Sequence, residues 1–166
     1  MEHTIGPMDA GDGDRVMEIF NHYVEHSFAA FPENPLPPRA FEMFLQMSAG
    51  LPALAARDGS GNMIGFGMLR RHSPIPAFAH TADVSYFIAP EHTGKGLGRE
   101  LLEGLEAEGR EKGIAVILAE ISSLNEGSIR FHARNGFVEC GRFPGVGRKH
   151  GRIFDVVWMQ KSLGKP

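Results

Sequence analysis

Two stretches of the chain repeat apolar residues with the period of an amphipathic α-helix, about 3.6 residues per turn. The first follows Asp12, and its apolar positions are Val16, Ile19, Phe20, Tyr23 and Val24. The second runs to Gly113, and its apolar positions are Leu97, Leu101, Leu102 and Leu105. Two further helices are predicted, one after Pro37-Pro38 and one from Asn125, a suitable N-cap, to Asn135-Gly136.

Seven segments have the short apolar or alternating character of β-strands, namely residues 3–8, 52–57, 63–70, 83–90, 114–121, 137–143 and 152–160. The turn-rich sequence DGSGN between the second and third predicts an antiparallel pair, and the last two form a hairpin around a loop at 144–151. The run IAVILAEI is continuously apolar, which is typical of a central strand covered on both faces.

The resulting order β, α, α, β, β, β, α, β, α, β, β predicts a mixed α/β fold. Its middle contains a strand, a glycine-rich loop, a helix and a strand, which form a right-handed crossover if the two strands are parallel. A chain of 166 residues is long enough for one ordinary domain and too short for two. We therefore expect a single domain over residues 1–166.

Composition narrows the functional classes. The formal net charge of −3 argues against a nucleic acid or an anionic membrane as partner, and no apolar run approaches the roughly 18–20 residues that cross a bilayer. Residues 1–11 have no basic region followed by an apolar run, so we expect no signal peptide. The lone Cys140 fits a reducing cytoplasm, and its strand setting predicts a small buried hydrophobe rather than a nucleophile.

The sequence HTGKGLG, residues 92–98, has three alternating glycines between a predicted strand and a predicted helix. Unpaired amides at a helix N-terminus attract anions, and glycine lets a phosphate approach the backbone. The spacing matches neither GxxxxGK[ST] nor GxGxxG. The pattern therefore predicts a phosphate site of another kind, with a simple flexible turn as the alternative.

The stretch YFIAPEHTGKGLGRELL resembles motif A of the GNAT superfamily of acyl-CoA-dependent N-acyltransferases, [QR]-x-x-G-x-[GA]. Gly96 and Gly98 match its glycines, whereas Thr93 stands where Gln or Arg is usual, which removes a side chain but leaves the amide donors. The blocks NHYVEHS, TADVSYFIAPEH, NEGSIRFHARNGF and KHGRIFDVVW resemble the phosphinothricin and methionine sulfone/sulfoximine N-acetyltransferase branch. The resemblance spans almost the whole chain and implies a GNAT fold, with a mostly antiparallel sheet and a splayed parallel strand pair flanked by helices.

The resemblance also implies acetyl-CoA as cosubstrate. Its pyrophosphate is expected on the backbone of Gly94, Lys95, Gly96, Leu97, Gly98 and Arg99. Its pantetheine arm is expected along Phe87 and Ile88, beside a wedge whose other wall is IAVILAEI, and Asn125 is expected to contact it from the far side. His22 and His26 have the i, i+4 spacing of metal ligands, but no third ligand accompanies them, so no metal is expected.

Amine acylation needs a neutral amine and a proton for the departing thiolate. An amine of pKa about 10.4 is more than three units too protonated at pH 7, which costs roughly 4–5 kcal/mol, whereas positioning can offset about 7–11 kcal/mol. By resemblance Asp83 accepts the amine proton, directly or through water, and His132 occupies the position of a thiolate-protonating tyrosine. The alternatives are a strand-end carboxylate bonded to a neighbouring loop and a structural helix histidine.

The expected acceptor is the primary amine of a small amino-acid-like molecule. Its pocket is expected to include Phe28 and Phe31, with a carboxylate bound by Arg70 or by Lys149 and His150 in the last loop. The alternatives are a polyamine, a peptide or protein N-terminus, and a non-catalytic acyl-CoA-binding module. The resemblance further implies a homodimer that pairs through its C-terminal strands.

Overall fold

The computed structural model describes residues 2–164, so residues 1 and 165–166 of the predicted domain lie outside the described residues. The described helices are α1 (Gly13–His26), α2 (Ala40–Met47), α3 (Leu97–Glu111) and α4 (Glu126–Arg134). The strands are β1 (His3–Pro7), β2 (Ala53–Asp58), β3 (Met63–Arg71), β4 (Thr81–Ile88), β5 (Val116–Ser122), β6 (Val138–Lys149) and β7 (Arg152–Ser162). The predicted order of strands and helices is confirmed.

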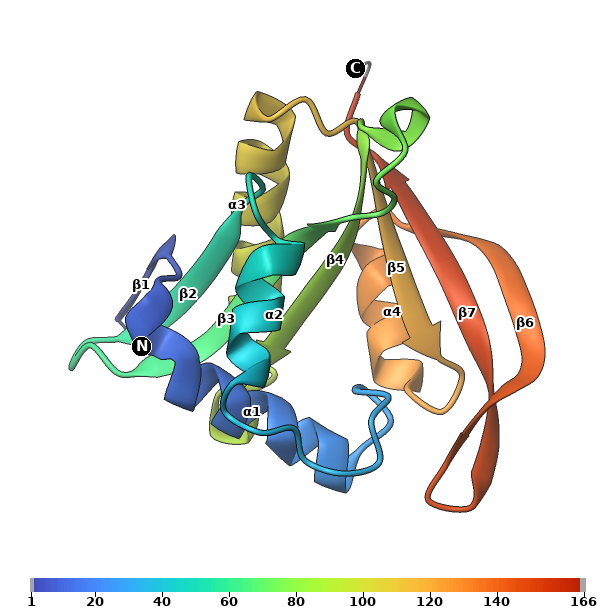
Figure 1. Cartoon of the computed structure of the whole chain (residues 1–166), viewed down its shortest axis with the longest axis horizontal. Helices are drawn as coiled ribbons and strands as arrows, with labels where there is room; N and C mark the ends of the chain where they lie inside the picture. The colour runs from blue at the N-terminus through green and yellow to red at the C-terminus, as the bar shows by residue number, and fades with distance from the viewer. Residues whose placement is uncertain (1, 165–166) are drawn as a thin grey trace.

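The strands form one sheet in the order β1-β2-β3-β4-β5-β7-β6. Every neighbouring pair is antiparallel except β4 and β5, which are parallel. This parallel pairing covers only Thr81–Asp83 against Val116–Leu118, after which the two strands diverge (Figure 1). The predicted splayed parallel pair is thus confirmed, and the gap between 84–88 of β4 and 119–122 of β5 is called the wedge below.

Two apolar clusters hold helices to opposite faces of the sheet. Helix α3 lies on one face, and α1 and α2 lie on the other (Figure 1). Leu101 and Leu105 of α3 pack in one cluster with strand residues such as Ile117, and Phe20 of α1 and Phe44 of α2 pack in the other with Phe66. Successive strand side chains point to opposite faces, so β2, β3 and β4 contribute to both clusters, whereas β5 and β7 contribute only to the cluster on the α3 side. Full burial of one such side chain contributes about 1.5–3 kcal/mol, which fixes the helices around the wedge.

The hairpin at the end of the chain differs from the prediction in two ways. The predicted loop at 144–151 is mostly strand, because β6 continues through a bulge to Lys149 and turns only at His150 and Gly151. At Gly147 the ring of Phe154 fills the place where a Cβ would stand, so only glycine lets β6 lie this close to Phe154 of β7. The prediction of a buried Cys140 is wrong, because β6 is the edge strand and leaves this residue exposed.

None of the helices between residues 2 and 164 is both long and apolar enough to span a bilayer.

Candidate active site

The glycine-rich loop leads directly into α3 with its amides exposed. Gly94 and Gly96 adopt φ angles of 73° and 88°, in the left-handed region that suits glycine. Among the described residues, the backbone N–H groups of 94–98 have no hydrogen-bond acceptor. A Cβ added at Gly94 would meet no atom within 4 Å, so the backbone there is open. This loop therefore presents the unpaired amides and the positive end of a helix dipole to an anion.

A groove of about 630 Å³ extends from this loop along residues 86–88 of β4, on the β4 side of the wedge. Seven of the nine predicted cofactor-binding residues line it: Phe87, Ile88, Gly94, Gly96, Gly98, Arg99 and Asn125. Asn125 caps α4 by accepting a hydrogen bond from the Ser128 amide on its side-chain oxygen. The remaining lining residues are Tyr23, Ala29, Tyr86, Thr93, Gly127, Ser128 and Phe131.

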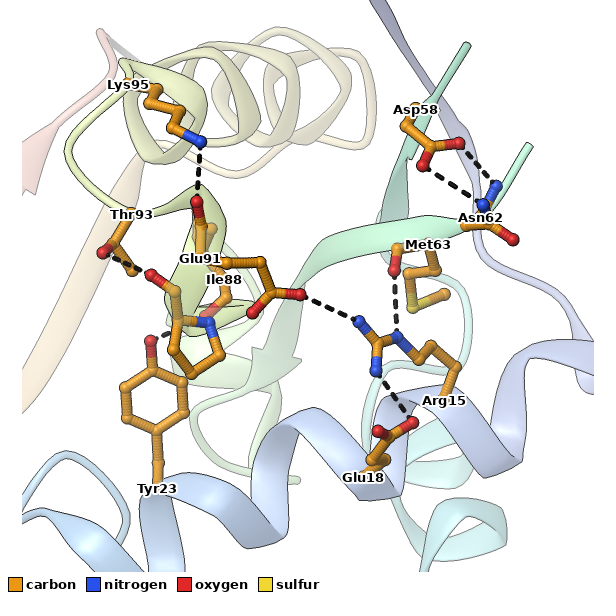
Figure 2. Close-up of polar contacts among 11 residues, drawn as sticks. Arg15, Glu18, Tyr23, Asp58, Asn62, Met63, Ile88, Glu91, Thr93 and Lys95 are labelled. Carbon is orange, nitrogen blue, oxygen red and sulfur yellow. Dashed lines mark hydrogen bonds and ion pairs between the residues drawn. The ribbon is translucent and has the colours of Figure 1, made fainter. Parts of the chain in front are cut away.

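The other two predicted cofactor-binding residues point their side chains elsewhere. Leu97 is buried in the apolar cluster beneath α3. Lys95 donates a hydrogen bond of 2.6 Å from Nζ to the carbonyl of Glu91, as Figure 2 shows. Both residues can contribute to the anion site through their backbone amides only.

Helix α1 anchors the end of β4 beside the groove (Figure 2). The Tyr23 hydroxyl donates a 2.6 Å hydrogen bond to the carbonyl of Ile88, and burial followed by the charge of Glu91 raises the pKa of Tyr23. Arg15 of the same helix donates to the Met63 carbonyl and pairs with Glu91. These contacts keep the last residue of β4 and the start of the glycine loop in a fixed position on α1.

A second cavity of about 210 Å³ lies on the α1 and α2 side of the sheet and shares Ala29 and Phe87 with the groove. It is called the acceptor cavity below. Its walls are mostly apolar, with Arg70, Ser85 and Glu120 as the polar exceptions. The full lining is Phe20, Ala29, Ala30, Phe31, Pro32, Phe44, Met47, Met68, Arg70, Val84, Ser85, Phe87 and Glu120.

Two of the five predicted acceptor-binding residues, Phe31 and Arg70, line this cavity. The Nε atom of Arg70 is buried and has no hydrogen-bond partner among the described residues. The guanidinium of Arg70 makes no hydrogen bond or ion pair among the described residues, and the residue lines the cavity. Arg70 is therefore the cation positioned to receive an anionic group.

The other three predicted acceptor-binding residues, Phe28, Lys149 and His150, do not line the cavity. Lys149 is fully buried, and its Nζ donates hydrogen bonds of 2.7 and 2.6 Å to the carbonyls of Ser27 and Ala30. Burial lowers the pKa of this ammonium, and Glu33 opposes the shift. Lys149 thus holds the segment that carries Ala29 and Phe31 rather than binding the acceptor, because two backbone carbonyls already use its charge.

Phe28 and His150 stand behind the same segment. Phe28 packs against the rings of His150 and Phe154, and the Arg152 guanidinium lies 5.2 Å from its ring centroid. The His150 amide donates to Glu33 with a length of 2.7 Å. These residues support the cavity wall from outside, since the hairpin turn packs against the residues that follow α1.

Asp83 is close to the acceptor cavity but does not line it. Its Oδ1 accepts a 2.9 Å hydrogen bond from Nδ1 of His72, and it lies opposite Arg70 in the register of β3 and β4. It also pairs with Leu118 at the last parallel position before the wedge opens. Asp83 thus lies at the point where β4 and β5 begin to diverge, which is called the fork below, and its carboxylate already has a partner in His72.

His132, the predicted source of the thiolate's proton, does not line the groove. His132 is 4% exposed and donates from Nδ1 to the Ser128 carbonyl at 2.7 Å, while the Tyr86 hydroxyl donates to Nε2. Burial lowers the pKa of His132, which the bond to Ser128 partly opposes, so the ring is neutral near pH 7. Tyr86, whose pKa burial and then Glu106 raise well above its usual value, lines the groove in its place.

The sequence pattern did not single out Glu120, although a charged residue inside the apolar run IAVILAEI is a signal that could have identified it. Its position becomes meaningful only through the fold, because alternation along β5 turns it away from the α3 face and toward the acceptor cavity. Partial loss of water raises the pKa of Glu120, the charge of Arg70 lowers it, and that of Asp83 raises it again.

The arrangement joins an anion-binding groove to a cavity that has charges of both signs. No cluster of three or more His, Cys, Asp or Glu side chains that could hold a metal ion occurs within residues 2–164. The chemistry that the two cavities can support is transfer of a group between a phosphate-bearing molecule in the groove and a small polar molecule in the acceptor cavity, across Phe87.

Comparison with known proteins agrees with this geometry. The chain is 34% identical to the L-methionine sulfoximine/L-methionine sulfone acetyltransferase of Pseudomonas paraeruginosa, over 93% of this chain and 92% of that protein. It is 35% identical to the phosphinothricin N-acetyltransferase of Alcaligenes faecalis, over 96% and 82%.

The fold is similar to that of a GNAT superfamily phosphinothricin acetyltransferase from Sinorhizobium meliloti, solved in complex with acetyl-CoA. The TM-score is 0.92 and the sequence identity 28%, with 99% of this chain and 90% of that chain covered. The profile of the acetyltransferase (GNAT) family matches residues 16–137. With its splayed β4–β5 pair, its glycine loop at the start of α3 and this match, the chain belongs to the acetyltransferase (GNAT) family.

Proposed function

We propose that the protein transfers acetyl from acetyl-CoA to the primary amine of a small amino-acid-like acceptor, by direct attack of the amine on the thioester. The acceptors that we favour are phosphinothricin, methionine sulfone and methionine sulfoximine, on which relatives at 34–35% identity are named to act. The observation that carries the proposal is the meeting of the groove and the acceptor cavity at Ala29 and Phe87.

The residues of the groove fit a coenzyme with a pyrophosphate. The open backbone at Gly94 and the unpaired amides of 94–98 suit the charged end, and the exposed edge of β4 at Phe87 and Ile88 suits an extended arm with amide groups. When bound there, acetyl-CoA supplies a thioester, an acylating group that reacts with amines. The protein's residues hold that end of the groove open because β5 pairs with β7 beyond the fork and not with β4.

The acceptor cavity fits a zwitterion better than a polycation. Arg70 offers an unpaired guanidinium to a carboxylate, and Glu120 offers a carboxylate to an ammonium group. The apolar side chains of Phe31, Phe44 and Met68 suit the remaining side chain of an amino-acid-like molecule. A polyamine would bring several positive charges to Arg70, which makes that alternative less favourable.

The two predicted catalytic residues would act indirectly. Asp83 does not line the acceptor cavity, so it would influence the amine only through an intervening water molecule or a neighbouring side chain. His132 would act on the thiolate through the Tyr86 hydroxyl, which lines the groove and donates to its ring. Positioning of amine and thioester in neighbouring cavities is worth about 7–11 kcal/mol, more than the acid–base contribution of either residue.

We further propose a homodimer and a cytoplasmic location. Exposed apolar side chains gather on β6 and β7, where Val138, Phe143, Val146 and Ile153 are each more than half exposed. Such an edge strand with apolar side chains is suited to pairing with a second copy. The lone Cys140 fits a reducing compartment.

The test is release of free thiol by the purified protein, given acetyl-CoA and each member of a panel of amino acids, their sulfone, sulfoximine and phosphinic analogues, polyamines and peptides. We expect turnover with amino-acid-like amines. Turnover with peptides or polyamines alone would refute the proposed acceptor class. Tight binding of acetyl-CoA without turnover on any amine would support a non-catalytic module instead.

A further inference from the structure

Beyond the fork of the sheet, the first residue of β5 that faces the acceptor side is Glu120. The parallel pairing of β4 and β5 ends at Asp83 and Leu118, and Glu120 follows Leu118 by two residues. Two residues advance a strand by about 6–7 Å, so the Glu120 carboxylate lies above the fork whereas Asp83 lies at its base. Ser85 has the corresponding place on β4, and both Ser85 and Glu120 line the acceptor cavity.

Resting on the proposed acetyl transfer, we propose that Glu120 is the residue that binds the acceptor's ammonium group and removes its proton. The relevant contrast is with Asp83, which is 18% exposed, does not line the acceptor cavity and holds the Nδ1–H of His72. Glu120 is exposed to the cavity and has no hydrogen bond or ion pair among the described residues. Its carboxylate is therefore available to a ligand.

The charges around Glu120 suit a base that works near neutral pH. Arg70 on β3 stabilises its ionised form, while partial dehydration and the neighbouring carboxylate of Asp83, which is itself bonded to His72, favour the protonated form. The balance raises the pKa of Glu120. A carboxylate with a raised pKa takes a proton more readily than an ordinary one.

The reaction removes two protons from the acceptor's nitrogen, and Glu120 takes the first of them. An ammonium group loses two protons on becoming a secondary amide. The first passes to the Glu120 carboxylate, which frees the nitrogen lone pair to form the C–N bond, and Glu120 later returns this proton to water. The second proton leaves the nitrogen as the C–S bond breaks. The electron pair of that bond stays on sulfur, which takes up a proton and is released as the thiol.

Arg70 and Glu120 together also determine which acceptors the cavity selects. An α-amino acid presents its carboxylate and ammonium close together, and Arg70 and Glu120 line one small cavity with complementary charges. The acceptor is thereby oriented with its amine toward Phe87, where the groove begins. An amine without a carboxylate would pair only with Glu120 and would leave the charge of Arg70 without a partner.

The test compares Glu120→Gln with Asp83→Asn in the intact protein, with Glu108→Gln, an exposed carboxylate on α3, as the matched control. With acetyl-CoA and the best amino-acid acceptor, we expect Glu120→Gln to lower kcat about 100-fold at pH 7 while acetyl-CoA affinity is unchanged. The deficit should shrink as the pH approaches the amine pKa, because the amine then arrives neutral. Asp83→Asn should lower kcat less than tenfold, and Glu108→Gln should have no effect.

The outcomes separate this proposal from the proposed function. If the wild type releases thiol and Glu120→Gln keeps full activity with an unchanged pH profile, the assignment of Glu120 is overturned and the acetyltransferase stands. The same conclusion follows if Asp83→Asn alone removes the dependence on pH. If the wild type releases no thiol with any amine, the proposed function fails, and the role of Glu120 fails with it. Far-UV circular dichroism and melting of each variant identify losses of activity that come from misfolding.

Discussion

The hydroxyl of Tyr86 on β4 donates a hydrogen bond to Nε2 of His132 on α4, and this bond joins the wall of the groove to the core beneath it. Nδ1 of His132 donates in turn to the Ser128 carbonyl, so the orientation of the ring is fixed at both nitrogens. Because His132 is buried and Tyr86 is not fully so, a reacting group in the groove would meet the hydroxyl and not the imidazole. His132 is thus a positioning residue for Tyr86.

This burial makes stability depend on the protonation of His132. Its pKa is lower in the folded chain than the value of about 6.5 expected in the unfolded chain, so the unfolded state binds the proton more tightly. The contribution of His132 to the free energy of unfolding is therefore fully present above pH 6.5, and it is lost as the pH falls through the lower pKa of the folded state. We expect the loss to be at most about 1.4 kcal/mol per pH unit, and urea denaturation between pH 8 and 5 measures it. His132→Gln should be less stable at pH 8 and should lack this slope; parallel curves for the two proteins would contradict the prediction.

Gly98→Ala separates stability from coenzyme binding. A Cβ at this helical position would meet its nearest atoms at 3.5–3.6 Å, an ordinary contact, and alanine favours a helix by about 1 kcal/mol over glycine. We expect an unchanged or slightly higher Tm together with at least tenfold weaker acetyl-CoA binding by calorimetry, because the methyl group enters the groove. Gly141→Ala on β6, where an added Cβ has open space, is the control and should bind acetyl-CoA normally. Equal binding by both variants would show that the coenzyme does not approach Gly98.

Arg70→Met should discriminate between acceptors with and without a carboxylate. Loss of a hydrogen bond to a charged group costs about 1.5–3 kcal/mol, so kcat/KM for an amino-acid acceptor should fall about 10- to 150-fold. For an amine that lacks the carboxylate, the change should be much smaller. Arg71→Met is the matched control, because Arg71 is exposed and does not line the acceptor cavity. A similar fall for both kinds of amine would argue against carboxylate binding by Arg70.

Lys149→Met should affect the acceptor cavity from a distance. It leaves the carbonyls of Ser27 and Ala30 without their donor, which costs about 1–3 kcal/mol for each buried group and loosens the segment that carries Ala29 and Phe31. We expect a lower Tm and a severalfold higher KM for the acceptor, with acetyl-CoA affinity changed less. Lys112→Met, at an exposed lysine, should change neither quantity. An unchanged KM in folded Lys149→Met protein would mean that the segment keeps its shape without this lysine.

The apolar surface of β6 and β7 predicts the oligomeric state. Sedimentation should give twice the 18.2 kDa mass of the chain, and Ile153→Asp or Val146→Asp should shift it to the monomer, because burying an unpaired charge opposes association. Ile75→Asp is the control, since Ile75 is also exposed but lies in the loop between β3 and β4. A monomeric wild type, or a dimer that survives both substitutions, would exclude this interface.

The order of elements and the glycine loop could be predicted from local patterns, because helix period, strand alternation and turn residues are properties of neighbouring positions. The boundaries of β6 could not, since its residues 144–149 have little strand character and are held in the sheet by pairing with β7. Cys140 was predicted to be buried for a related reason: its apolar surroundings indicate a strand, but only the sheet order makes β6 an edge.

The sequence by itself determined the family, the fold class and the position of the glycine-rich loop at the start of α3, because these depend on residues close together along the chain. Only the tertiary structure decided which charged side chains face the acceptor. Lys149 contacts residues more than a hundred positions away, and Glu120 is brought to Arg70 by strand order and by the divergence of β4 from β5. The physical reason is that burial and charge pairing are settled between distant segments, where a shift of one residue in a strand reverses the face on which a side chain lies.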